Sequence, residues 1–307
     1  MEQNYHIGTP GRKWEEKEKK QWLSEQKVKR SYKEHVLDKL QYLEKDFEII
    51  NYGSLKYEGF SEYPLYALKN KDFNTTKKTI LVTGGVHGYE TSGVKGALKF
   101  AKEKAPTYFN KYNIIIVPCV SPWGFETINR WNPLTIDVNR SFKNDGESSE
   151  AKCLISFIKQ YKNSILSHFD LHETTNSDMT EFRPALKAKE GIDLFSGDIP
   201  DGFYILGSKY HFNEEFEKAI IKAVEQVTHI VPLDKDGKLI GENALSQGIA
   251  NIDTHEVQGV CFALTKVSYA ITTEVYPDSP NTNEEECNNA QVAAIVGGIN
   301  WLIENHL

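Results

Sequence analysis

Three short clusters of histidine and acidic residues follow apolar runs in this sequence. The first runs from Gly84 to Glu90, the second from Asp170 to Glu173, and the third is Glu274 alone. Imidazole and carboxylate groups are costly to bury without partners. One shared metal ion would give several of them a partner at once, so these residue types indicate metal chemistry.

Two histidines and one glutamate form a common ligand set for catalytic zinc, with one position left for water. His87 and Glu90 are three residues apart across an expected strand-to-helix turn, and His172 would come from a neighbouring strand. The pattern H-x-x-E is common by chance, and His87 alone equally fits a histidine satisfied within its turn. The position of all three clusters at expected strand ends favours one Zn²⁺ held by His87, Glu90 and His172.

Alternating strand and helix patterns must position these clusters. Apolar, β-branched runs predict strands at residues 47–52, 63–69, 79–83, 114–117, 165–171, 203–206 and 270–273, with a turn near Gly53 and Gly59 between the first two. Helical patterns cover 90–104, 147–162, 213–229 and 284–304. This alternation predicts an α/β fold with a mostly parallel or mixed central sheet and helices on both faces. Ligands bind beyond the carboxyl ends of such strands, where the clusters fall.

The chain has no Gly/Ser-rich or Pro-rich linker, so we expect a single catalytic domain over residues 46–307. Residues 1–45 are expected to form an N-terminal helical extension, because apolar side chains recur at helical spacing among many lysines and glutamates. Residues 174–202, rich in Asp, Gly and Pro, are expected to form a loop over the pocket.

Composition limits the partners. The net charge of -7 argues against nucleic acid, which needs a basic face. The first 20 residues contain no apolar segment of a secretion signal, and no run approaches the length of a membrane span. The four cysteines are far apart and contain no C-x-x-C, as expected for reduced thiols in the cytoplasm. None of these features indicates an oligomeric state.

Arginine is scarce among the 36 basic residues, and three of the five arginines fall in the middle of the chain: Arg130, Arg140 and Arg183. Arginine differs from lysine in its planar, bidentate fork. Either the pocket requires that fork, or the placement is chance.

Four motifs in order resemble the zinc carboxypeptidase family, compact bacterial type, and its relatives, the succinylglutamate desuccinylases and aspartoacylases. They are GVHGYE at 85–90, DVNRSF at 137–142, DLH at 170–172 and TTEV at 272–275, and the resemblance spans roughly residues 78–275. It implies that His87, Glu90 and His172 bind zinc and that Glu274 is the general base. It further implies that Arg130 polarises the scissile carbonyl, and that Asn139 and Arg140 grip a substrate carboxylate.

Physical chemistry supports these roles. Zinc lowers the pKa of bound water to roughly 7, and a glutamate can take the proton and give it to the leaving amine. A single hydrogen-bond donor to the developing oxyanion, the role implied for Arg130, typically contributes about 3–4 kcal/mol to transition-state stabilisation. Arg140 has the planar fork that binds a carboxylate through two hydrogen bonds. Asp170 can orient a ligand histidine, although a turn cap explains it equally well. The alternative for Glu274 is a surface glutamate at the end of an edge strand.

The sequence also departs from the carboxypeptidase pattern. These enzymes usually carry a mobile tyrosine in the loop before the general base, yet residues 231–268 contain none. Tyr204 and Tyr210 are the possible substitutes. Residues 170–175 (DLHETT) also look like the third-ligand motif of the desuccinylase–aspartoacylase branch. Arg183 either holds a second substrate carboxylate or pairs with Glu181 or Glu190 on the surface.

Three functions follow. The first is a cytoplasmic metallocarboxypeptidase or peptide amidase that cuts a small peptide next to a free carboxylate. The second is a deacylase of N-acyl amino acids, and the third is a non-catalytic module that binds metal or peptide. Glu274 and Arg130 argue against the third, because a pure binder needs neither.

Overall fold

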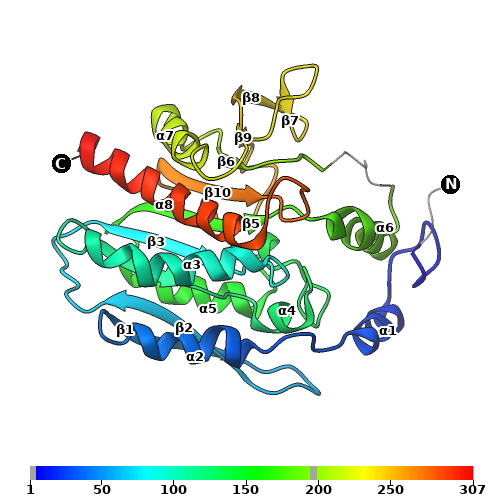
Figure 1. The fold of residues 1–307 in the computed structure, drawn as a ribbon. Coiled ribbons are helices and arrows are strands. Elements are labelled where there is room, and N and C mark those ends of the chain that lie inside the picture. Colours follow the sequence, from blue (N-terminus) through cyan, green and yellow to red (C-terminus); the bar gives the residue numbers. More distant parts are fainter. Residues whose placement is uncertain (1–4, 194–198, 307) are drawn as a thin grey trace.

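The computed structural model describes residues 5–193 and 199–306, which form an α/β fold around a ten-stranded mixed sheet (Figure 1). The strands are β1 (Phe47–Leu55), β2 (Tyr63–Asn70), β3 (Thr79–Gly84), β4 (Asn113–Val117), β5 (Ile165–Glu173), β6 (Tyr204–Ser208), β7 (Lys238–Leu239), β8 (Glu242–Ser246), β9 (Ile249–Ile252) and β10 (Tyr269–Val275). Their order across the sheet is β1-β2-β4-β3-β5-β10-β6-β9-β8-β7.

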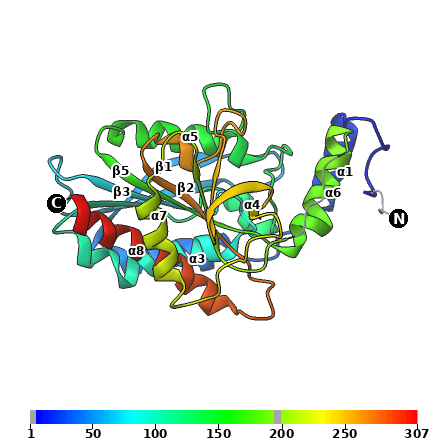
Figure 2. The same ribbon diagram turned by 90° about the horizontal axis from the view of Figure 1, so that it is seen from above.

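Helices cover both faces of this sheet. The α-helices are α1 (Glu16–Glu25), α2 (Asp38–Leu40), α3 (Thr91–Glu103), α4 (Pro122–Thr127), α5 (Ser149–Ile158), α6 (Arg183–Glu190), α7 (Glu214–Val224) and α8 (Glu284–His306). Short π and 3₁₀ turns are η1 (Lys33–Leu37), η2 (Gln41–Leu43), η3 (Ala105–Tyr108), η4 (Val138–Arg140), η5 (Lys159–Tyr161), η6 (Asp178–Phe182) and η7 (Phe262–Leu264). Figure 2 shows α3, α7 and α8 on one face and α5 on the other. Within the described ranges, no helix is both long enough and apolar enough to cross a membrane.

Four neighbouring strands at the centre of the sheet, β4, β3, β5 and β10, are parallel. Because both of their faces are covered, their apolar residues form continuous runs and not an alternating pattern. Ile80, Leu81 and Val82 on β3 are all fully buried, as are the isoleucines of β4. The predicted fold class is confirmed, and antiparallel pairs on both sides of this centre make the sheet mixed.

Two sequence predictions about the strands need correction. Gly53 does not end the first strand, since β1 continues to Leu55 through a register shift between Asn51 and Gly53. The edge formed by β7, β8 and β9 was not predicted. Those strands have two to five residues each, and β8 has no buried residue, so their sequence carries no continuous apolar run.

The prediction of a loop at residues 174–202 is wrong where η6 and α6 form; residues 194–198 lie outside the described part of the chain. Phe182 and Ala185 from this segment are buried, and Ala185 belongs to the same apolar cluster as Trp14 and Trp22 of the N-terminal segment. Packing against those aromatic rings stabilises helical structure in this segment, which its polar local composition did not indicate. Figure 2 shows α1 and α6 at the same end of the sheet.

The N-terminal segment is helical only in part. After α1 the chain has no regular secondary structure over residues 26–31, and then passes through η1, α2 and η2. Trp22 lies 5.6 Å from Trp131 and 6.1 Å from Trp123, measured between ring centroids. The boundary placed at residue 45 stays a prediction.

Candidate metal centre

His87, Glu90 and His172 meet at the carboxyl ends of adjacent parallel strands. His87 and Glu90 lie in the turn between β3 and α3, His172 lies near the end of β5, and β5 is the direct neighbour of β3. All three side chains are almost completely buried, with relative exposures of 2%, 1% and 1%. Their candidate ligand atoms all lie within 4.8 Å of one another. The structure thus brings the three predicted ligands together, and their role as zinc ligands stays a prediction.

The turn that carries two of these groups depends on glycines. Gly85 has φ of +60°, a conformation that residues with a Cβ rarely adopt. At Gly88 a Cβ would lie 2.0 Å from the backbone nitrogen of Phe125, so only glycine lets the turn pack on α4. Glu173, which follows His172, accepts hydrogen bonds from the backbone nitrogens of Thr91 (2.9 Å) and Ser92 (2.6 Å) at the start of α3. This carboxylate links the third ligand to the helix that follows the first two.

Outer carboxylates fix the orientation of both histidine rings. Nε2 of His87 lies 3.0 Å from Asp137, and Nε2 of His172 lies 2.9 Å from Asp170. Both rings consequently turn Nδ1 toward Glu90, at 2.7 Å in each case. A carboxylate on the far nitrogen of a ligand histidine is the usual support of a metal site. For Asp170 the structure favours this role over a turn cap.

The donor set fits a metal ion. The Oε2 atom of Glu90 lies 2.7 Å from Nδ1 of His172, yet it has no hydrogen-bond partner of acceptable geometry among the described residues. A buried carboxylate oxygen in that state is expected where a cation completes the site. Burial opposes ionisation of Glu90, but His172 and His87 outweigh it and lower its pKa to about 2.

A second group, His168, Asp170 and Cys261, also clusters in the described core. Here the Thr83 hydroxyl lies at the centre, 2.9 Å from Nε2 of His168 and 2.6 Å from Oδ1 of Asp170. A hydroxyl group already fills the space between the candidate ligands. We therefore interpret this group as the support of Asp170, the residue that orients His172.

Glu274 lies beside the candidate ligands, on the third of three adjacent strands. It is the register partner of His172 on β5 and of Tyr204 on β6, so it belongs to a central strand and not to an edge. Its Oε2 accepts a hydrogen bond from Thr174 (3.0 Å), whose hydroxyl is 2.8 Å from the hydroxyl of Tyr204. Burial raises the pKa of Glu274 to about 8; His172 opposes that rise and Glu90 adds to it.

Arg130 enters the same network. Its Nε donates to Asp137 (3.1 Å), the carboxylate that also orients His87, and its Nη1 lies 3.5 Å from Asp178. Tyr89 donates to the same Asp178 oxygen at 2.8 Å. The guanidinium is thus held from two sides, next to the turn that carries His87 and Glu90.

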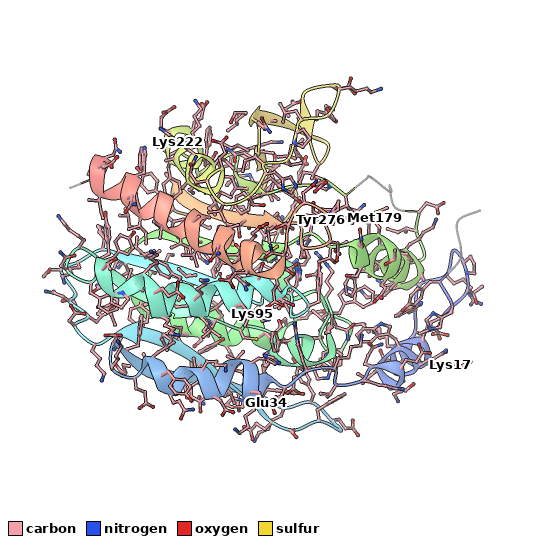
Figure 3. All side chains as sticks on the ribbon, in the orientation of Figure 1. Lys17, Glu34, Lys95, Met179, Lys222 and Tyr276 are labelled. Carbon is pink, nitrogen blue, oxygen red and sulfur yellow. The ribbon has the colours of Figure 1, made fainter. Side chains whose placement is uncertain are left out.

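The other predicted substrate groups line the same cavity, which has a volume of about 1450 Å³. The side-chain oxygen of Asn139 accepts from the backbone nitrogen of Cys261 (2.7 Å), so the amide nitrogen is its group for a carboxylate. Arg140 is exposed and donates to the carbonyl of Asn139 (2.7 Å). Arg183 lies at the start of α6, with Nη1 2.8 Å from Sδ of Met179, a residue labelled in Figure 3.

Tyr204 and Tyr210, the possible substitutes for the missing loop tyrosine, differ in whether they line the cavity. Tyr204 is buried and lines the cavity beside Glu274. Tyr210 is 45% exposed, bonds Asp253 (2.7 Å) and does not belong to the cavity wall.

Comparisons with known proteins agree with this geometry. Residues 76–190 match the model of the succinylglutamate desuccinylase/aspartoacylase catalytic domain. Similar solved structures include a candidate metallopeptidase from Shewanella amazonensis SB2B, with 18% identity over 88% of this chain and 92% of that one and a TM-score of 0.64. A metallo-carboxypeptidase from Burkholderia cenocepacia has 16% identity, coverage of 86% and 68%, and a TM-score of 0.57.

The fold of the chain is similar to that of these metallopeptidase and metallo-carboxypeptidase structures, and residues 76–190 carry the similarity to the desuccinylases and aspartoacylases. Bovine thrombin-activatable fibrinolysis inhibitor, solved with tick carboxypeptidase inhibitor, shares the fold across 96% of this chain and 99% of its own, with 14% identity and a TM-score of 0.57. No curated protein matches the sequence.

Sequence reasoning missed several residues of the candidate site. Tyr89 and Asp178 hold Arg130, while Thr174 bonds Glu274; Tyr204, named as a possible substitute tyrosine, bonds Thr174. Asp137 and Tyr89 stood inside quoted motifs, which was a usable signal. Asp178 had none, because it reaches the site only through the helical turn η6, in a segment expected to be a loop.

Proposed function

We propose that this chain is a zinc-dependent hydrolase that cleaves an amide bond next to a free carboxylate of a small peptide. The observation that carries the proposal is the convergence of His87, Glu90 and His172 at the carboxyl ends of β3 and β5, with Glu274 on β10, the strand next to β5. One Zn²⁺ held there would act as a Lewis acid and lower the pKa of water to about 7.

The chain's own residues perform the remaining tasks. Glu274 takes the proton of the attacking water and returns it to the leaving amine. Thr174 bonds one oxygen of that carboxylate, which leaves the other oxygen to accept the proton. A dication at the three ligands would favour the ionised form of Glu274 and offset the rise in its pKa that burial causes.

The arginines supply binding and stabilisation. Arg130 can donate to the carbonyl oxygen as negative charge develops there, because Asp137 and Asp178 hold its guanidinium in place. Asn139 and Arg140 line the same cavity and would bind the substrate carboxylate. Arg183 is proposed for a second carboxylate, since it too lines that cavity.

The size of the cavity supports a peptide substrate. Its volume of about 1450 Å³ exceeds the roughly 300–1,000 Å³ of common small-ligand pockets. The net charge of -7 argues against nucleic acid as the partner, and we propose no membrane partner. We propose the cytoplasm as the location, since the four cysteines are free thiols.

A second function is supported by the family match. The succinylglutamate desuccinylase/aspartoacylase model covers His87, Glu90, Arg130, Asn139, Arg140 and His172. Hydrolysis of an N-acyl amino acid at the same metal would use the same residues.

The two functions separate in a substrate panel. Zinc-loaded protein is assayed against peptides with free C-termini, the same peptides with amidated C-termini, and acyl amino acids, with Glu274→Gln as the inactive control. Cleavage of free peptides alone supports the first proposal, and cleavage of acyl amino acids alone replaces it with the second. If the wild-type protein binds zinc but cleaves nothing, a non-catalytic binding module is the better account.

A further inference from the structure

Arg30 lies in the segment between α1 and η1, which has no regular secondary structure, and its side chain contacts the turn that carries the proposed ligands His87 and Glu90. Nη2 donates to the carbonyl of Gly88 (2.8 Å), and Nη1 donates to the hydroxyl of Thr91 (2.6 Å). Nε donates to the carbonyl of Phe125 (2.6 Å), and the guanidinium carbon lies 3.6 Å from the centre of the Phe125 ring. One side chain thereby ties the turn that holds His87 and Glu90 to α4.

The position of the Arg30 guanidinium is electrostatically unfavourable, which indicates that its hydrogen bonds serve to hold the geometry of the turn. The three acceptors are neutral oxygens, and burial lowers the pKa of Arg30. Thr91 is the first residue of α3, whose positive helix end repels a cation. Two carboxylates, Glu173 and Glu284, oppose this lowering of the pKa, and Glu173 also accepts from the first two backbone nitrogens of that helix.

The segment that carries Arg30 is itself anchored. The backbone nitrogens of Lys29 (2.7 Å) and Arg30 (3.2 Å) donate to the carbonyl of Glu126, and the backbone nitrogen of Tyr32 donates to its side chain (2.8 Å). The other carboxylate oxygen of Glu126 accepts from Tyr63 (3.0 Å) on β2. In Figure 3 the segment runs from α1, where Lys17 is labelled, past α4 to Glu34.

We propose that Arg30 is a positioning residue of the metal centre, and that through it the N-terminal segment sets the zinc affinity of the site. The inference rests on the proposed zinc site. Gly88 lies between His87 and Glu90, and Thr91 follows Glu90. The two hydrogen bonds therefore hold the turn on either side of Glu90. Three acceptors on two segments need a planar fork, which lysine lacks.

The test compares Arg30→Lys and Arg30→Met with Arg12→Lys and Arg12→Met. Arg12 belongs to the same N-terminal segment but is exposed and lies beside Gly191, far from the turn in sequence. Zn²⁺ dissociation constants are measured by competition with a chromogenic chelator, at a temperature where circular dichroism shows every metal-free variant to be folded. Thermal unfolding of the metal-free proteins is recorded in parallel.

We expect zinc affinity to fall roughly 10-fold or more in Arg30→Met, as is typical when an outer support of a metal site is lost. Arg30→Lys should show a smaller loss, and both Arg12 variants should bind as the wild type does. If the Arg30 variants lower only the unfolding temperature and keep wild-type zinc affinity, Arg30 is structural and the inference is wrong. If the wild-type protein itself binds no zinc, the proposed function fails, and the inference with it.

Discussion

Two buried glutamates in this protein have opposite surroundings. Glu90 lies between two histidines, which lower its pKa to about 2 in spite of burial. Glu217, on α7, is also completely buried, but burial raises its pKa to about 8, and within the described part of the chain its carboxylate accepts a side-chain hydrogen bond only from Asn251, at 3.5 Å. Its Oε1 and the Oδ1 of Asn251 lack hydrogen-bond partners among the described residues. The surroundings of Glu90 thus favour a charged carboxylate that can bind a cation, whereas those of Glu217 favour the protonated, neutral form.

The partners explain the difference. Around Glu90, Asp137 and Asp170 orient the histidine rings, so cationic or metal-bearing groups face the carboxylate. Around Glu217, both unpartnered oxygens face Gly207, where a Cβ would lie 2.5 Å from Glu217 and 2.3 Å from Asn251. Two acceptors directed at one place need a donor, which a proton on Glu217 supplies.

The largest effect is expected on the metal side of this comparison, at the general base. Glu274→Gln should keep zinc but lower kcat by roughly 10²–10⁴-fold, because an amide cannot accept the proton. Single-turnover kinetics with zinc-loaded protein measures this. Wild-type kcat in the variant would remove Glu274 from the mechanism.

Asp170→Asn tests the orientation of His172. An amide cannot fix the ring as a carboxylate does, so zinc affinity should fall by roughly 10–100-fold. Asp145→Asn, at a side chain that is 84% exposed, is the matched control and should bind zinc normally. Equal affinity in the two variants would mean that Asp170 only stabilises the fold.

Arg140→Lys tests the substrate carboxylate. The charge stays but the bidentate fork is lost, so KM should rise roughly 10-fold while the unfolding temperature changes little. Steady-state kinetics and thermal unfolding separate these outcomes. A lower unfolding temperature with unchanged KM would make Arg140 structural.

The smallest effect is expected at Glu217, on the pH dependence of the unfolding temperature. The folded protein keeps a proton on Glu217 up to pH about 8, whereas the unfolded chain releases it near pH 4.5. Its contribution to stability is therefore complete below pH 4.5 and is lost as the pH rises toward 8. Glu217→Gln should unfold at a higher temperature than the wild type at pH 9, and the difference should shrink toward pH 5. A difference that does not vary with pH would contradict the assigned proton.

Sequence reasoning could bring the candidate ligands together because residue type and strand position were both visible. His87 and Glu90 follow the apolar run at residues 80–82, as expected for a strand covered on both faces, whereas β5, which carries His172, also contains the buried polar residues Ser167, His168 and Asp170. The residues that support the site were harder to predict. Arg30 is far from the candidate ligands in sequence, and Asp178, although it comes soon after His172, is far from Arg130; both act through contacts that only tertiary structure creates. The exposed strand β8 lacks any burial pattern that would mark it.

The most direct test makes the same substitution on both sides of the comparison. Elemental analysis of purified Glu90→Gln and Glu217→Gln, after zinc loading and removal of free metal, measures zinc per chain. The account predicts about one equivalent in the wild type and in Glu217→Gln and almost none in Glu90→Gln, because an uncharged amide is a poor zinc ligand. Equal zinc in the two variants would contradict the metal centre proposed here.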